Sequence, residues 1–239
     1  MFGSRIKSSE KVSLSGTPEV ELLLRPSARA RRLSLRVSRL DGRVTLSVPT
    51  GTPRREALRF AEERADWIRG HLADIPQDIS PELGDEIPFL GQNHRLVAGP
   101  GRSLRAADRC IFLPPSAQTN PGPRLMAFLK HQARGQLDQA SRHYATRIGR
   151  DFGRLTLRDT RSRWGSCSSD GNLMYSWRLI MAPPEVLQYV AAHEVSHLVH
   201  MDHSPDFWAQ VEEIFPNHKA PRTWLRENGH SLHRFRFRD

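Results

Sequence analysis

Apolar and polar residues alternate along two short stretches near the start of the chain. Within residues 30–38 and 43–48, aliphatic side chains occupy every second position. A period of two places those side chains on one face of a strand. Asp41-Gly42 between the two stretches is a tight-turn signal, so the pattern predicts a hairpin with one buried face. Residues 19–24 predict a further strand before it.

Later segments have apolar residues at helical spacing, which buries one side of a helix. Helices are expected over residues 52–70, 121–150, 184–197 and 205–215, and around Trp224 and Leu225. Short strands are expected between them, at residues 87–90, 94–98, 110–113, 154–159 and 172–180. The pattern therefore predicts an α+β protein with small sheets.

The helix expected over residues 184–197 ends in His193-Glu194-x-x-His197. Residues four apart project from the same face of a helix, so His193 and His197 can direct two imidazoles at one metal ion. Glu194 lies beside the first imidazole, where its carboxylate can take a proton from a metal-bound water. The alternative is a surface helix that carries these residues by chance. The apolar residues that precede the motif, at 186–187 and 189–192, argue against it.

A hydrolytic zinc usually has three protein ligands and one open position, so a third ligand is required. On a continuing helix, His200 would lie about 10 Å along the axis from His193, too far for one ion. His203 is the better candidate, because residues 204–205 signal a new helix and the chain has turned by then. We expect His200 to make that turn in the left-handed conformation, with some strain. The spacing thus predicts zinc bound by His193, His197 and His203.

The chain of 239 residues has 36 Lys and Arg against 26 Asp and Glu, a formal net charge of +10. Such a balance favours phosphate-rich or acidic partners. The arginines from Arg25 to Arg43 are the candidates for a non-specific, electrostatic contact with nucleic acid. The alternative is a basic surface that is simply solvated.

Two cysteines, Cys110 and Cys167, lie far apart and form no C-x-x-C pair, which argues against a disulfide framework. We expect Cys167 to be structural, because three histidines already fill the protein positions of a catalytic zinc. No stretch approaches the roughly 18 apolar residues of a membrane span. Residues 1–16 lack the apolar segment of a secretory signal, so we expect a cytoplasmic protein without membrane contact.

Several segments resemble the YgjP-like metallopeptidase family, predicted metal-dependent hydrolases related to SprT-like zincins. They are Arg163-Trp164-Gly165-Ser166-Cys167, Trp177-Arg178-Leu179 followed by Pro183, His193-Glu194-x-x-His197, and His203-Ser204-Pro205 with Phe207-Trp208. The resemblance covers about residues 155–220, and earlier only the Arg-rich hairpin and the Trp67-Ile68 helix look similar. It implies zinc on the three histidines and Glu194 as catalytic carboxylate. Metzincins match less well, because they have Gly in place of His200 and a later Met-turn.

The expected fold is α+β, with a zincin-like catalytic half and an N-terminal β-rich and helical half. The catalytic half combines a small sheet with the helix that carries His193-Glu194-x-x-His197. We expect a flexible lead-in over residues 1–18, a β-rich region with one helix over 19–118, a zincin-like metallopeptidase region over 119–230 and a basic tail over 231–239. The oligomeric state stays open.

The leading hypothesis is a zinc metallopeptidase in which Glu194 is the general base and returns its proton to the leaving amine. A second is a metal-dependent hydrolase of a nucleotide or other small phosphorylated substrate. A third is a nucleic-acid-associated protein with the hydrolase as effector. A fourth is a binding module with a structural zinc, which would not need Glu194. Arg161, Arg163 and Arg178 either contact a substrate carboxylate or phosphate, or form surface ion pairs.

Overall fold

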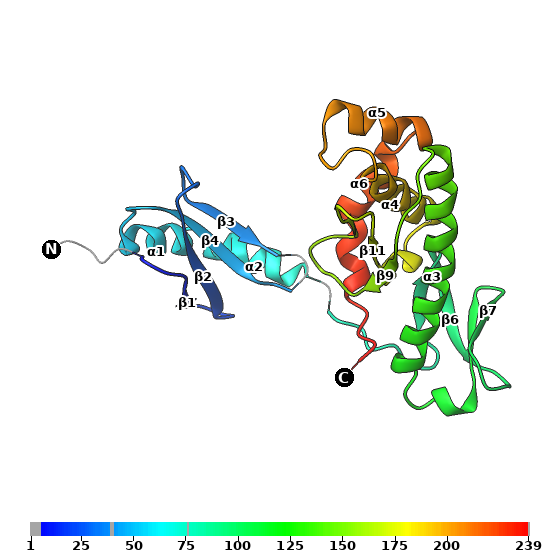
Figure 1. The fold of residues 1–239 in the computed structure, drawn as a ribbon. Coiled ribbons are helices and arrows are strands. Elements are labelled where there is room, and N and C mark those ends of the chain that lie inside the picture. Colours follow the sequence, from blue (N-terminus) through cyan, green and yellow to red (C-terminus); the bar gives the residue numbers. More distant parts are fainter. Residues whose placement is uncertain (1–5, 39–40, 76, 239) are drawn as a thin grey trace. The chain divides into compact units, whose positions relative to one another are not determined.

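The computed structural model describes residues 6–38, 41–75 and 77–238, and the chain divides into two compact units between Gln77 and Asp78. Both units combine helices and strands (Figure 1), which confirms the α+β prediction. The described residues include six α-helices. None of these helices combines the length and the apolar composition needed to cross a bilayer.

The first unit is a four-stranded sheet with two helices. The strands are β1 (Glu10–Leu14), β2 (Val20–Ser27), β3 (Ser34–Val37) and β4 (Val44–Pro49), and the helices are α1 (Arg54–Glu62) and α2 (Ala65–Ala73). The strand order is β1-β2-β4-β3. Val44, Leu46 and Val48 are buried and share one apolar cluster with Ile68 of α2, so the alternation seen in the sequence does bury one face of the sheet.

Two features of the first unit differ from the sequence-based expectation. β1 lies within the segment expected to be a flexible lead-in. This strand is held in place, because it pairs along its whole length with β2 and buries Leu14. The single helix expected over residues 52–70 is two helices separated at Glu63 and Arg64. No sequence signal marks this break, since both residues form helices readily.

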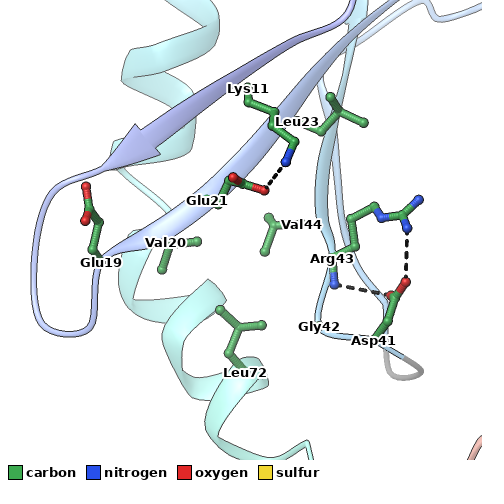
Figure 2. A pocket seen from close by; sticks show the side chains of 10 residues that line it. All are labelled: Lys11, Glu19, Val20, Glu21, Leu23, Asp41, Gly42, Arg43, Val44 and Leu72. Carbon is green, nitrogen blue, oxygen red and sulfur yellow. Dashed lines mark hydrogen bonds and ion pairs between the residues drawn. The ribbon is translucent and has the colours of Figure 1, made fainter. Parts of the chain in front are cut away.

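A hollow of about 560 Å³ lies in the first unit, between β1, β2, the turn before β4 and α2 (Figure 2). Four of its five charged side chains form ion pairs: Lys11 lies 2.9 Å from Glu21, and Arg43 lies 3.3 Å from Asp41. The fifth charged residue is Glu19. Because both signs of charge are present and most are paired, this hollow presents no strong field of a single sign to a ligand.

The second unit contains two further sheets. One consists of β5 (Glu86–Phe89), β6 (Gln92–Ala98), β7 (Arg105–Ala107) and β8 (Cys110–Leu113), in the order β5-β6-β8-β7. It repeats the arrangement of the first unit, with two antiparallel outer pairs around a parallel central pair. The other consists of β9 (Leu155–Arg158), β10 (Gly165–Cys167) and β11 (Leu173–Ser176), in the order β10-β11-β9. β10 is therefore an edge strand.

Four α-helices and three short 3-10 helices complete the second unit. They are η1 (Pro115–Ala117), α3 (Gly122–Arg147), η2 (Trp177–Met181), α4 (Pro184–Ser196), α5 (Pro205–Ile214), α6 (Lys219–Asn228) and η3 (Gly229–His233). In Figure 1, α3 runs along the length of this unit, from the end with β6 and β7 to the end with α5.

The boundary expected near residue 118 falls inside this unit. Leu96 and Ile111, from the sheet before it, belong to the same buried cluster as Leu125 and Leu129 of α3. The sheet of β5 to β8 therefore shares a core with α3, and the structure places the division at residue 77 instead.

Two other segments of this unit differ from expectation. Trp177-Arg178-Leu179, expected as part of a strand, forms the fully buried 3-10 helix η2 that leads into α4. The tail over residues 231–239 is anchored as far as it is described, because Phe235 and Phe237 are buried in the main core. The amide of Arg236 donates to the carbonyl oxygen of Ile79 at 2.7 Å, and this bond ties the tail to the start of the unit.

Candidate active site

Helix α4 carries the first two candidate ligands at its C-terminal end. Proline occupies its first helical position and Glu185 its first turn, both favourable at a helix start. Its apolar residues are buried in the core of the second unit, which fixes the helix firmly. His193 lies in the last turn, and His197 is the C-cap residue, with φ −67° and ψ −12°.

The turn after α4 is not made by a left-handed residue. His200 is absent from the described non-glycine residues with positive φ, so the expected strain at this position is wrong. Instead the helix end tightens: the amides of Leu198 and Val199 donate to the carbonyl oxygens three residues earlier, those of Val195 and Ser196, at 2.9 and 3.1 Å. Hydrogen bonds of this shorter kind commonly close a helix.

The structure brings together the ring nitrogens of His193, His197 and His203, within 4.8 Å of one another. Nε2 of His203 lies 3.2 Å from Nε2 of His193. Two nitrogens bound tetrahedrally at about 2.0 to 2.1 Å to one zinc ion lie about 3.3 Å apart, so this spacing fits such an ion.

His200 lies outside this group and acts on a neighbouring imidazole through its backbone. Its carbonyl oxygen accepts a hydrogen bond of 2.8 Å from Nδ1 of His197. A carbonyl can only accept, so Nδ1 carries the proton and Nε2 of His197 is the nitrogen left for a metal. Hydrogen bonds of this kind orient metal-binding imidazoles and fix their tautomer.

Burial favours the neutral form of His193 and His197. Burial is the main reason why the pKa of His193 falls to about 3, and the neighbouring His197 and His203 lower it further. Burial also lowers the pKa of His197, although its bond to His200 acts in the opposite direction. Neutral imidazole is the form that binds a metal. Nδ1 of His193 is buried and has no hydrogen-bond partner among the described residues.

Glu194 projects from α4 beside these histidines and is only 6% exposed. Its carboxyl group lies against the backbone of Gly165 on the edge strand β10. Burial raises the pKa of Glu194 to about 8, while the positive charge of Arg163 acts to lower it. A buried carboxylate with a raised pKa is a stronger base than one in water.

Aromatic rings of α5 enclose the histidines from another side. Ser204 caps this helix as expected, accepting a hydrogen bond from the amide of Phe207 at 3.4 Å. The Phe207 ring stacks on the His197 ring with 4.5 Å between their centroids, and the ring centroids of Trp208 and His193 lie 5.8 Å apart. These rings hold the imidazoles in place and exclude water from one side of the cluster.

A pocket of about 240 Å³ opens beside His193 and Glu194. Four of its side chains are largely apolar and come from three parts of the chain: Trp164, Tyr189, Val190 and Leu225. No sequence pattern predicted this wall. Tyr189 precedes His193 by one helical turn, so it was the member that spacing could have revealed.

The other candidate side chains lie in different surroundings. Arg163 lines the pocket, whereas Arg161 is exposed and Arg178 is buried. Arg178 forms an ion pair of 2.7 Å with Asp159, so its role is structural. Burial raises the pKa of Cys167 to about 11, which does not suit a nucleophile.

An α+β fold with three imidazoles gathered beside a buried carboxylate points to the metal-dependent hydrolases. The family comparison shows the same class. The model of the YgjP-like metallopeptidase domain matches residues 31–228, and the chain belongs to this family of metal-dependent peptidases.

Among solved structures, the crystal structure of the metallopeptidase zymogen of Pyrococcus abyssi abylysin is 20% identical in sequence, with a TM-score of 0.36. The similarity covers 39% of this chain and 95% of that chain. No curated protein gives a significant match.

Proposed function

We propose that the protein is a zinc-dependent peptidase in which His193, His197 and His203 hold the metal and Glu194 is the general base. The observation that carries this proposal is the gathering of three ring nitrogens within 4.8 Å, next to a buried carboxylate. Three neutral imidazoles with one open position suit zinc best among the common metals. When bound, zinc lowers the pKa of a water molecule and polarises the scissile carbonyl group.

The role of Glu194 follows from its place beside the imidazoles. Its carboxylate takes a proton from the attacking water and then gives it to the nitrogen of the leaving amine. The structural-zinc alternative gives no reason for a carboxyl group to be buried here without an ion pair. The buried position is costly, and a catalytic use explains it.

Edge strand β10 supports a peptide as substrate. Its one strand partner among the described residues is β11, so its outer edge can hydrogen-bond to an extended peptide. The apolar pocket next to Glu194 suits a substrate side chain. Arg163 is its single Lys or Arg residue, which makes a multiply charged phosphate a poorer fit. These features favour the peptidase over the phosphohydrolase alternative.

The test combines metal analysis with cleavage assays on the full chain. We expect about one zinc ion per chain, cleavage of casein or a peptide library, and loss of cleavage after chelation. Glu194→Gln should keep the metal and lose cleavage by about 100-fold or more, because the amide cannot accept the proton. Unchanged cleavage by Glu194→Gln would contradict the general-base role. Hydrolysis of nucleotides but not peptides would favour the phosphohydrolase alternative.

A further inference from the structure

A second pocket of the second unit lies away from the histidines. It has a volume of about 440 Å³ and is formed by α3, the end of β9, η2 and the C-terminal segment. Its lining contains one acidic residue, Asp159, and five cationic residues: Lys130, Arg158, Arg178, Arg236 and Arg238. We refer to it as the cationic pocket. β9 and β10 are the two outer strands of their sheet, so this pocket and Glu194 belong to opposite edges.

Two of the five cations already form ion pairs with carboxylates of the protein. Arg178 donates to both oxygens of Asp159, and its third nitrogen donates to the carbonyl oxygens of Leu232 and Phe235. Arg236 forms an ion pair of 2.6 Å with Asp78. These bonds fix the wall of the cationic pocket, so the other side chains project from a rigid frame.

Three cations remain for a ligand. The side chains of Arg158 and Arg238 form no hydrogen bond or ion pair with another described residue, and that of Lys130 has only a longer-range attraction to Asp159. Five positive charges less the two carboxylates of Asp159 and Asp78 leave an excess of three. Like charges that converge on one hollow repel one another, and a multiply charged anion relieves this repulsion.

The chemistry of these side chains suits phosphate. A guanidinium group binds two oxygens of one phosphate with parallel hydrogen bonds, and an ammonium group adds a point charge. The partly buried Met126 and the buried Phe237 give the hollow an apolar floor. We propose that the cationic pocket binds a phosphate-bearing small molecule between Lys130, Arg158 and Arg238. Inorganic phosphate and a phosphate ester are the two sources of this group.

The experiment titrates the full chain with inorganic phosphate, pyrophosphate and AMP by calorimetry at low ionic strength. We expect the double variant Arg158→Gln/Arg238→Gln to bind the preferred probe at least tenfold more weakly. Arg142→Gln is the matched control, because Arg142 lies on the exposed surface of α3 and pairs with Asp138. Its affinity should be unchanged. Phosphate bound at the histidines would respond to neither change, so the comparison locates the site.

The single variant Lys130→Gln keeps the proposal testable if the double variant does not fold. It should weaken binding at least threefold. Preference for phosphate over AMP would identify the free anion as the source, and the reverse would identify an ester. Equal affinity of all variants for every probe, or no binding of any probe, would overturn the proposal. So would binding of a single-stranded oligonucleotide through these residues when no small probe binds.

Discussion

A Cβ atom on Gly165 would lie 2.5 Å from Oε1 and 2.6 Å from Cγ of Glu194. The edge strand and the carboxyl group can therefore approach as they do only because residue 165 has no side chain. This relationship connects two segments that are far apart in sequence. It also gives the glycine a role that does not depend on backbone conformation.

We expect Gly165→Ala to displace Glu194 and to lower cleavage by about 100-fold or more, since a general base contributes at least about this factor. Metal content should not change, because the histidines are untouched. Gly135→Ala is the control, since nothing lies within 4 Å of a Cβ atom there and alanine favours the α3 helix. Full activity of Gly165→Ala would show that the carboxylate does not need its observed position.

The third ligand can be tested by comparing two histidines. His203→Ala should sharply reduce the zinc content, because it removes one of three ring nitrogens. His200→Ala should retain the metal, because His200 contributes only its carbonyl oxygen, which alanine also has. Zinc is measured by atomic emission after dialysis. Equal loss from both variants would mean that the third ligand is wrongly assigned.

His233 should make stability depend on pH. Burial, helped by the charge of Arg178, lowers the pKa of His233 from the ordinary 6.5 to about 4. The unfolded chain therefore binds a proton more readily than the folded chain. Stability should be complete above pH 6.5 and fall by roughly 3 kcal/mol as the pH approaches 4.

The measurement for His233 is the free energy of unfolding from pH 7.5 to 4, in wild type and His233→Gln. The variant should lack this part of the acid destabilisation, whatever its stability at neutral pH. His131→Gln changes an exposed histidine and is expected to keep the wild-type slope. An identical slope in all three proteins would contradict the assignment.

Arg178 should be important for stability. Arg178→Leu leaves Asp159 unpaired and removes the donor to two carbonyl oxygens, so we expect a loss of about 3 kcal/mol. Arg142→Leu breaks an exposed pair and should cost less than about 0.5 kcal/mol. Urea denaturation measures both. A similar cost for the two variants would mean that the buried network contributes little.

The first unit offers a test of the proposed contact with nucleic acid. In the strand register, Arg25 lies opposite Ser47 and Arg36 lies opposite Thr45. Ser47 and Thr45 are two residues apart on β4, so both arginines lie on the same face of the sheet. Binding to duplex DNA should be independent of sequence and weaken with salt, with a slope near 0.9 per phosphate contact. Arg25→Gln/Arg36→Gln should reduce the slope. A strong preference between two unrelated duplexes would contradict this expectation.

The sequence predicted the gathering of the histidines well, because it follows from local rules. Residues four apart share a helical face, and the capping residue Ser204 showed where the chain must turn. The turn itself was mispredicted, since the tighter hydrogen bonds to Val195 and Ser196 leave no sequence signal. That these histidines bind zinc, and that the protein is cytoplasmic, stay predictions.

Contacts between distant segments could not be predicted in the same way. The approach of Gly165 to Glu194 depends on how β10 packs on α4, which no periodicity encodes. Because the tail is rich in basic residues, its sequence did not indicate that Phe235 and Phe237 are buried. Their burial depends on the core that surrounds them in the folded protein. The boundary near residue 118 was placed where the hydrophobic pattern changes from strands to a helix. Because β8 and α3 share one core, the division between the units does not fall there but at residue 77.

The C-terminal segment has a practical consequence for recombinant work. The family match ends at residue 228, yet Phe237 packs on Trp177 and the carbonyl oxygens of Leu232 and Phe235 bind Arg178. A fragment trimmed to residues 31–228 would expose this part of the core and would also lack β1 and β2. Such a fragment is expected to aggregate. Expression limits taken from the family match would therefore give a protein in which the activity cannot be measured.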